Sequence, residues 1–320
     1  MNSHYRLSIV MVNYRTPALV EASLAALTPM LAPAGACVVV VDNASGDGSY
    51  ERLAAWTPPA EAEGRVLILK AERNGGFSYG NNLGAAAIAS DYVFFLNSDA
   101  TPRPGALTAL LAAAEENPDA GLITPTIVGS DGIAQVSRFR RHSLISEFVD
   151  GAQTGPITRL FPQGEVPIFP DDETSAPDWV SFAAVLLRRD AMEKAGPMDE
   201  GFFLYYEDCD YCRRITDAGY AVARAPGAVI EHDAGGSTKL REKSERGARL
   251  PAYYYRSRAR YFRKYYGAFG PVLANVAWAA GRAVALMRGL VGRPAPRLNE
   301  GRLADMWIGW RGERTPDADA

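Results

Sequence analysis

Four short apolar runs near the N-terminus constrain the fold of this chain most strongly. Residues 7–12, 37–41, 66–69 and 92–96 are each continuous, rich in β-branched or aromatic side chains, and followed at once by polar residues. Strands that are apolar on both faces are typical of a parallel sheet covered by helices on both sides. Since helical stretches separate the runs, the sequence predicts an α/β fold with a Rossmann-like, mostly parallel central sheet.

The polar residues that follow these runs indicate a ligand site. In a parallel sheet the carboxyl ends of the strands meet at one edge, where open α/β folds bind their ligands. We therefore expect Asn13, Asp42, Arg73 and Asp99 to converge there. The two aspartates also have a simpler interpretation, because Asp often closes the turn after a strand.

Two common nucleotide-binding fingerprints are missing from this edge. No G-x-G-x-x-G follows the first run, and the chain has no G-x-x-x-x-G-K-[ST] motif. A Gly75-Gly76 pair instead precedes the third predicted helix, where bare backbone N–H groups can approach a pyrophosphate. Loops also use glycine for conformational reasons, so the pair has two interpretations.

Charge and cysteine content narrow the class of protein. A formal net charge of −3 over 320 residues does not indicate a nucleic-acid-binding protein. Residues 239–264 nevertheless hold ten Lys or Arg against two Glu. This favours an anionic partner, a phosphate or a lipid surface, or else a solvated helix face. Three cysteines fit a reducing compartment and no signal peptide is evident, so we expect a cytoplasmic protein.

Taken in order, the motifs of the chain resemble those of family 2 glycosyltransferases, in the rhamnosyltransferase-like branch of bacterial cell-surface polysaccharide synthesis. The resemblance covers about residues 6–265, and the gaps between the motifs are those of the family. The matching stretches are VNY (12–14), VDNASGDGS (41–49), NGGF (74–77), NNLG (81–84), LNSD (96–99), GFFLYYEDCDYCRR (201–214) and His232 with GGS (235–237).

The resemblance implies a GT-A fold, a nucleoside-diphosphate-sugar donor, inversion at the anomeric carbon and a divalent metal, Mg²⁺ or Mn²⁺. A metal on the two phosphates neutralises the charge of the leaving group. Asp99 would be its ligand, and Asn97 stands where the family's Asp-x-Asp motif has its first acid. The other donor-binding residues that the resemblance implies are Asp42 beside the base, Asn13 and Tyr14 as its walls, Gly76 and Asn81 along the pyrophosphate, and Arg73.

The acidic pair Glu207-Asp208 is the candidate for acid–base chemistry. Inverting transfer needs a carboxylate to take the proton of the attacking hydroxyl. The resemblance assigns this role to Asp208, with Glu207 as second candidate, although acids in a first helical turn also complement the helix dipole. It makes His232 a metal ligand or phosphate contact, whereas a lone His after a strand is usually structural.

We expect a GT-A domain over residues 1–265 and a C-terminal amphipathic helix and tail over 266–320. The first of these divides into a donor half (1–128), an acceptor half (129–235) and a lid with the basic segment (236–265). Residues 129–178, with five prolines between 156 and 177, suggest irregular loops on the acceptor side. Residues 180–187 predict one strand, and Trp179 before it either stacks on an acceptor sugar or packs in the core.

The C-terminal apolar stretch, residues 271–291, is interrupted by Arg282 and Arg288 and is too broken to predict a membrane span. Asn275, Arg282 and Arg293 fall on one helical face, which favours an interfacial helix, with docking on the domain as the alternative. We expect peripheral contact through residues 239–293 with the cytoplasmic face of the inner membrane, near a polyprenyl-diphosphate-linked acceptor.

The sequence thus predicts an inverting glycosyltransferase that moves a sugar, with rhamnose as a candidate, from a dTDP- or UDP-sugar to a glycan or lipid-linked glycan. A catalytically inactive nucleotide-sugar-binding homologue is the main alternative, because Asn97 replaces an acid. A sugar nucleotidyltransferase would need a glycine-rich basic loop after the first strand. A processive synthase would carry a Gln-x-x-Arg-Trp motif, and the sequence has neither feature.

Overall fold

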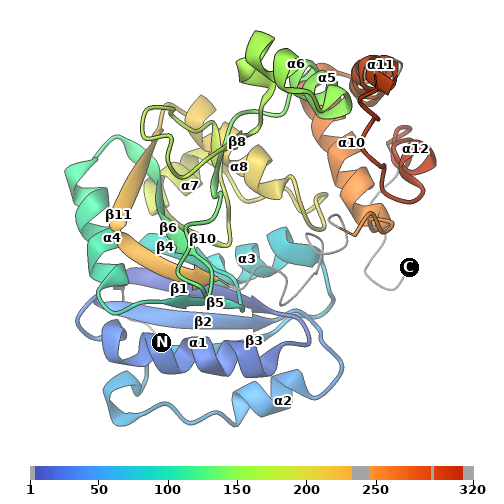
Figure 1. Cartoon of the computed structure of the whole chain (residues 1–320). Helices are drawn as coiled ribbons and strands as arrows, with labels where there is room; N and C mark the ends of the chain where they lie inside the picture. Colours follow the sequence, from blue (N-terminus) through green and yellow to red (C-terminus); the bar gives the residue numbers. More distant parts are fainter. Residues whose placement is uncertain (1–3, 233–245, 290–291, 313–320) are drawn as a thin grey trace.

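The computed structural model describes residues 4–232, 246–289 and 292–312, and an eight-stranded sheet forms its centre (Figure 1). In one half of the sheet the strands lie in the order β3-β2-β1-β4, and neighbouring strands are parallel. They are β1 (Tyr5–Asn13), β2 (Ala36–Asp42), β3 (Val66–Lys70) and β4 (Ser90–Leu96). The four apolar runs therefore form the parallel strands that the sequence predicts.

The other half of the sheet is mixed, and the strands continue in the order β10-β6-β11-β5. They are β10 (Ala184–Arg188), β6 (Ala120–Val128), β11 (Ala221–His232) and β5 (Ala100–Pro102). β10 runs antiparallel to β4 and β6, and β5 runs antiparallel to β11. The prediction of one strand over residues 180–187 is wrong, because a turn at residues 182–183 separates β10 from β9 (Trp179–Val180), which belongs to a second sheet.

Helices cover both faces of the central sheet, and the alternation of side chains along β4 shows how. Phe94 points to the face covered by α1 (Pro17–Leu31) and α4 (Ala106–Glu116). Phe95 points to the opposite face, where it joins residues of three helices, α3 (Gly76–Ala87), α7 (Arg189–Ala195) and α8 (Glu207–Asp217). Both phenylalanines are fully buried, so the strand has no solvent face. A short helix, α2 (Ser49–Ala54), follows β2.

Residues 129–178 are not the irregular loops that the sequence suggests. They contain α5 (Leu144–Ala152), α6 (Gly155–Leu160), β7 (Arg138–Phe139) and β8 (Pro167–Ile168), and β7 pairs with both β8 and β9. A capping box between Ser143 and Ser146 opens α5. The elements are short and interrupted by prolines, so they show no sustained period in the sequence.

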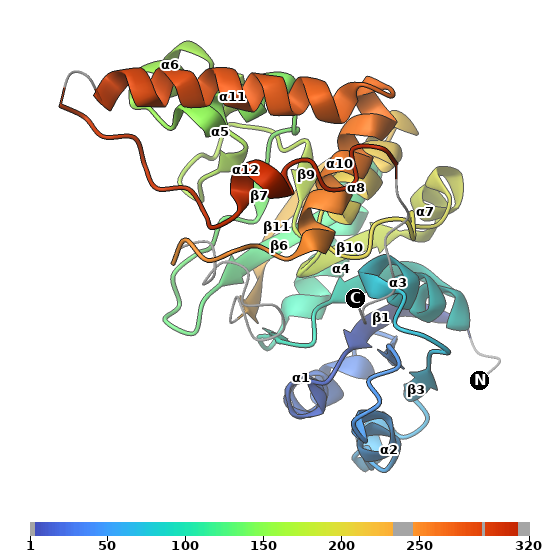
Figure 2. The same ribbon diagram turned by 90° about the vertical axis from the view of Figure 1, so that its right-hand side faces the viewer.

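The C-terminal elements are α10 (Ala252–Tyr266), α11 (Gly270–Gly289) and the short α12 (Arg302–Asp305). α11 lies alongside α5, which is far from it in the sequence (Figure 2). The two helices approach closely because a Cβ at Gly281 would meet the carbonyl of Phe148, and one at Gly151 would meet that of Trp278. The structure therefore shows α11 docked on α5, which is the alternative considered in the sequence analysis.

The faces of α11 are reversed relative to the interfacial helix expected from the sequence. Asn275 is 5% exposed and accepts a hydrogen bond from Arg258 Nη1 at 2.8 Å, so this side chain faces inward, and Arg282 is half-buried. Arg293 lies beyond the end of α11 and is exposed, so the prediction that it shares a face of this helix is wrong. The exposed positions are all apolar: Leu273, Val276, Ala279, Ala280, Ala283, Leu286 and Met287. Among the described residues, 270–288 form the one helix long and apolar enough to cross a membrane by length and composition, and 39% of this stretch is buried.

Candidate functional site

Asn13 and Asp42 end neighbouring parallel strands, and their side chains meet at the carboxyl edge of the sheet. Asn13 Nδ2 donates to Asp42 Oδ1 at 2.7 Å, and the Ser45 hydroxyl donates to the same oxygen at 2.6 Å. Asp42 Oδ2 accepts from the Ser45 N–H, three residues on, at 3.1 Å, so the carboxylate also closes the turn after β2. Asp42 is therefore held in a fixed position, and both interpretations of it remain compatible with this geometry. Tyr14, half-buried beside Asn13, carries the Arg15 guanidinium 5.0 Å from its ring.

The glycine pair at the start of α3 binds a loop of the acceptor half. Gly76 has φ +83°, and a Cβ on it would collide with the carbonyl of Phe203. That carbonyl accepts a hydrogen bond from the Phe77 N–H at 2.8 Å. The amide of Asn81, fully buried, donates to the Phe77 carbonyl at 3.0 Å. The start of α3 at Gly76 thus also joins the two halves of the protein, whereas the Asn81 amide bonds within α3.

Arg73 lies at the same edge, after β3. Its guanidinium carbon is 4.6 Å from the centre of the Tyr79 ring, and its Nη2 is 3.8 Å from a carboxylate oxygen of Glu200. Half of the Arg73 side chain is exposed, at 51%. The charge can therefore reach an anionic ligand at the edge of the sheet.

Asp99 and His232 are far apart in sequence but adjacent in the structure. β11 pairs antiparallel with β5, and this register places His232 opposite Ala100. His232 Nε2 lies 3.3 Å from Asp99 Oδ1, with the Asp99 side chain only 3% exposed. Within the described ranges this buried carboxylate oxygen has no hydrogen-bond partner. An oxygen and an imidazole nitrogen at this spacing fit two ligands of one divalent cation.

Asn97 is positioned by its backbone, with its N–H donating to the Ala183 carbonyl at 2.9 Å and its carbonyl accepting from Ala100 N–H at 3.1 Å. No group of three or more His, Cys, Asp or Glu that could hold a metal occurs among the described residues. Among the described residues, Asp99 and His232 are thus a pair of candidate ligands and not a complete set.

Glu207 and Asp208 open α8 after an unusual turn. Tyr205 and Tyr206 both have positive φ, 69° and 66°, a strained conformation for bulky residues that often marks functional sites. Burial raises the pKa of Asp208 to about 6. Burial and the neighbouring Asp208 charge raise the pKa of Glu207 well above its usual value of 4.5. Two adjacent carboxyl groups with raised pKa values are typical of acid–base sites.

Asp210, the third acid of the segment, has a structural role. It is fully buried, and its carboxylate lies 3.0 Å from Arg214 Nε and 2.6 Å from Lys264 Nζ. The Tyr265 hydroxyl donates to it at 2.7 Å. These contacts attach α8 to α10 and fix the helix that carries Asp208.

Trp179 is half-buried and packs within the protein. Its ring stacks on Phe139 with the ring centres 4.0 Å apart, and its indole N–H donates to the Arg140 carbonyl at 2.9 Å. The centre of the His142 ring lies 5.7 Å away. The core interpretation of Trp179 therefore describes its contacts, while an acceptor-stacking role stays a prediction.

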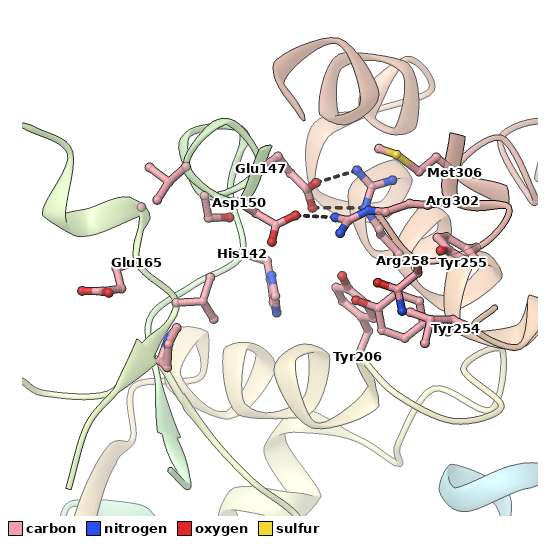
Figure 3. A pocket seen from close by; sticks show the side chains of 17 residues that line it. His142, Glu147, Asp150, Glu165, Tyr206, Tyr254, Tyr255, Arg258, Arg302 and Met306 are labelled. Carbon is pink, nitrogen blue, oxygen red and sulfur yellow. Dashed lines mark hydrogen bonds and ion pairs between the residues drawn. The ribbon is translucent and has the colours of Figure 1, made fainter. Parts of the chain in front are cut away.

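A cavity of about 390 Å³ lies next to Tyr206 and was not anticipated from the sequence (Figure 3). Glu147 and Asp150 of α5 face Arg258 of α10 and Arg302 of α12 across it, and His142 lies between β7 and α5. Arg258 belongs to the basic segment 239–264 noted in the sequence, but that signal indicated an anionic partner and not a cavity with paired charges.

The predicted lid falls on residues 233–245 in large part, which lie outside the described residues. Of the residues predicted for the site, the structure brings together Asn13 with Asp42, Gly76 with Asn81, and Asp99 with His232. Asp208 follows the loop that contacts Gly76. The donor-side and acid–base candidates therefore belong to one connected region.

Comparison with known protein sequences gives independent information. Residues 8–175 match the family Glycosyl transferase family 2. An N-acetylglucosaminyl-diphospho-decaprenol L-rhamnosyltransferase of Mycobacterium tuberculosis is 28% identical over 248 residues, which cover 72% of this chain and 77% of that protein. A pre-mycofactocin glycosyltransferase of the same organism is 32% identical over 170 residues, covering 52% of this chain and 32% of that protein.

Two solved structures share the fold. The mannosyltransferase PcManGT from Pyrobaculum calidifontis, in complex with GDP-Man and Mn²⁺, has a TM-score of 0.56 at 15% identity and covers 91% of this chain and 76% of its own. GalNAc-T7 with UDP, GalNAc and Mn²⁺ has a TM-score of 0.51 at 16% identity and covers 79% of this chain and 47% of its own. At these identities the likeness concerns the fold alone.

Proposed function

The chain belongs to glycosyltransferase family 2 and has the GT-A fold, and from this premise we propose that it is an inverting sugar transferase acting on a lipid-linked glycan. The observation that carries the proposal is the relative that covers most of both chains, which is named for L-rhamnosyl transfer to N-acetylglucosaminyl-diphospho-decaprenol. By this likeness we propose rhamnose as the sugar, dTDP or UDP as its carrier, and a polyprenyl-diphosphate-linked glycan as the acceptor.

The donor is proposed to bind along the carboxyl edge of the sheet. Asp42, Asn13 and Tyr14 would contact the base, and Arg73, Gly76 and Asn81 would lie along the diphosphate.

Asn97 would reach the ribose or a metal-bound water. Asp99 and His232 would hold Mg²⁺ or Mn²⁺, which when bound neutralises charge on the departing nucleoside diphosphate. Asp99 Oδ1 supports this assignment, because it lies 3.3 Å from His232 Nε2 and makes no hydrogen bond to any residue that the structure describes.

Asp208 is the proposed general base. Its carboxylate would take the proton of the acceptor hydroxyl as that oxygen attacks the anomeric carbon from the face opposite the diphosphate. With a pKa of about 6 it is ionised at neutral pH and still basic enough to accept a proton. Glu207, whose carboxyl pKa is raised by burial and by the neighbouring Asp208 charge, is the second candidate for this role. The aromatic residues before this pair would exclude water that hydrolyses the donor.

The outer face of α11 is the proposed contact with the cytoplasmic face of the inner membrane. Its exposed stripe is apolar along the whole helix, and residues 270–299 contain four Arg and no acid. An apolar face flanked by arginines matches the surface of an anionic bilayer. Attachment there would bring the protein to a lipid-linked acceptor, while the inward face of the helix stays docked on α5.

A thermal-shift screen of the full chain against UDP-, dTDP- and GDP-sugars, with and without Mn²⁺, tests the donor assignment. We expect stabilisation by a UDP- or dTDP-sugar that increases with Mn²⁺. A transfer assay with the stabilising sugar nucleotide and N-acetylglucosaminyl-diphospho-isoprenol then tests the reaction. Stabilisation without transfer or donor hydrolysis would favour the inactive homologue that Asn97 suggests, and no stabilisation by any donor would contradict the proposal.

A further inference from the structure

The cavity beside Tyr206 has walls from four separated parts of the chain. α5 supplies Glu147 and Asp150, α10 supplies Tyr254 and Arg258, and residues 164–167 and 299–306 close it. Its volume of about 390 Å³ is within the range of small-molecule sites. Tyr206 lines the cavity and directly precedes the Glu207-Asp208 pair, so the cavity lies beside the turn that leads to the proposed base.

The charges around the cavity are already paired. Arg258 binds Glu147 through two parallel hydrogen bonds of 2.7 and 3.1 Å, and its third nitrogen donates to Asn275. Arg302 pairs with Asp150, which also accepts from the Trp278 indole N–H at 3.0 Å. With Glu165, three carboxylates and two guanidinium groups line the cavity. No net positive charge remains there to attract a diphosphate.

The remaining lining combines aromatic, neutral polar and aliphatic side chains. Aromatic rings can pack on the apolar face of a sugar ring, while the polar groups can bind its hydroxyls. The rings of His142 and Tyr206 lie 4.9 Å apart, and Tyr254 lies 5.9 Å from Tyr206. Burial lowers the pKa of His142 to about 4, so the neutral imidazole offers one donor and one acceptor at pH 7. Carboxylates held in place by arginines add fixed acceptors for hydroxyl groups.

From the paired charges, the aromatic walls and the position beside Tyr206, we infer that this cavity is the subsite for an uncharged sugar ring of the acceptor. The inference rests on the proposed function, since it assumes a glycan acceptor. The diphosphate of a lipid-linked acceptor would lie outside the cavity, because its guanidinium groups are committed to carboxylates. Glu147 and Asp150 would bind the ring hydroxyls and would be positioning residues for the attacking hydroxyl.

The test fills the cavity without disturbing the charged pairs. Val166 lines it with a half-buried side chain, so Val166→Trp occupies the space at little cost to folding, and Val166→Ala is the matched control. The probe is N-acetylglucosaminyl-diphospho-isoprenol, observed by saturation-transfer NMR on the full chain. We expect ring-proton signals with the parent protein and with Val166→Ala. With Val166→Trp the apparent Kd should rise by at least about tenfold, which is about 1.4 kcal/mol.

The donor side provides the internal control. Val166→Trp is expected to keep the melting temperature of the parent, its stabilisation by the sugar nucleotide and its slow donor hydrolysis. If the parent protein shows no ring-proton signal, or if Val166→Trp gives the same signal, the cavity is not the sugar subsite. If no sugar nucleotide stabilises the parent protein, the proposed function is contradicted instead. Failure of the subsite and failure of the proposed function are therefore distinguishable.

Discussion

Asp208 is the residue whose chemistry depends most on its surroundings. Its carboxyl has a pKa of about 6 because it is buried, and a general base works only in its ionised form. We expect kcat/KM to fall about tenfold per pH unit below about pH 6 and to be level from about pH 7 to 8. Asp208→Asn should lower kcat by about 10²- to 10⁴-fold while donor stabilisation is retained. Turnover by this variant near the parent rate would remove Asp208 as the base.

The same residue should lower stability at high pH. Because the pKa of Asp208 is raised from 3.8 on folding, the folded chain holds this proton more tightly than the unfolded chain. Its contribution to the free energy of unfolding is therefore present at low pH and lost as pH rises through about 6. Asp208→Asn, which cannot ionise, should melt at a higher temperature than the parent at about pH 8. The gain should shrink toward about pH 4, and the exposed Glu63→Gln should show no such trend.

The proposal that Asp99 and His232 hold a divalent metal predicts how substitutions change metal binding. Asp99→Asn removes the only charged ligand of the pair, so Mn²⁺ binding in the presence of UDP should weaken by at least about tenfold, measured by water-proton relaxation. Asn97→Asp adds a carboxylate next to it and should tighten binding. Glu231→Gln, one residue from His232 and facing Arg103, is the control. Equal Mn²⁺ affinity in all four proteins would place the metal elsewhere.

At the scale of elements, α11 has the clearest separation of faces. Leu273 and Val276 are 45% and 58% exposed, and each would bury in a bilayer. Leu273→Glu with Val276→Glu should weaken co-sedimentation with phosphatidylglycerol vesicles by at least about tenfold, since burying one such side chain is worth about 1.5–3 kcal/mol. Ile133→Glu changes a more exposed apolar residue elsewhere, at 67%, and should leave vesicle binding unchanged.

Sedimentation velocity separates the bilayer from a second copy of the chain as the partner of this face. A concentration-dependent dimer that the double glutamate variant abolishes, together with unaltered vesicle binding, would show that α11 contacts another protomer. A monomer with vesicle binding that depends on the two residues supports the membrane contact.

At the scale of the whole molecule, the Glu147–Arg258 pair joins parts of the chain that are 111 residues apart. Both side chains are buried, at 6% and 4% exposed, and their closest atoms are 2.7 Å apart. Glu147→Leu leaves a buried guanidinium unpaired and should cost about 3–5 kcal/mol in the free energy of unfolding by urea. Adding Arg258→Met should recover most of this loss. Equal stability of the single and double variants would mean that the pair does not hold α10 against α5.

Short-range patterns in the sequence determined the parallel half of the sheet and the positions of its polar ends. The apolar runs could be identified because each strand is buried on both faces, and the edge follows from parallel pairing alone. The proximity of Asn13 and Asp42 could be predicted from this edge alone, since the two residues end adjacent strands. The resemblance added His232, whose proximity to Asp99 depends on the register between β11 and β5.

Tertiary structure decided what depends on contacts between distant segments. Asn275 of α11 faces inward because it binds Arg258. The helical period in the sequence is the same whether a polar face meets water or a buried guanidinium group. The cavity beside Tyr206 forms where short elements meet, and the raised pKa of Asp208 arises from burial. Burial and facing direction are properties of the packed chain, whereas local sequence specifies period and propensity.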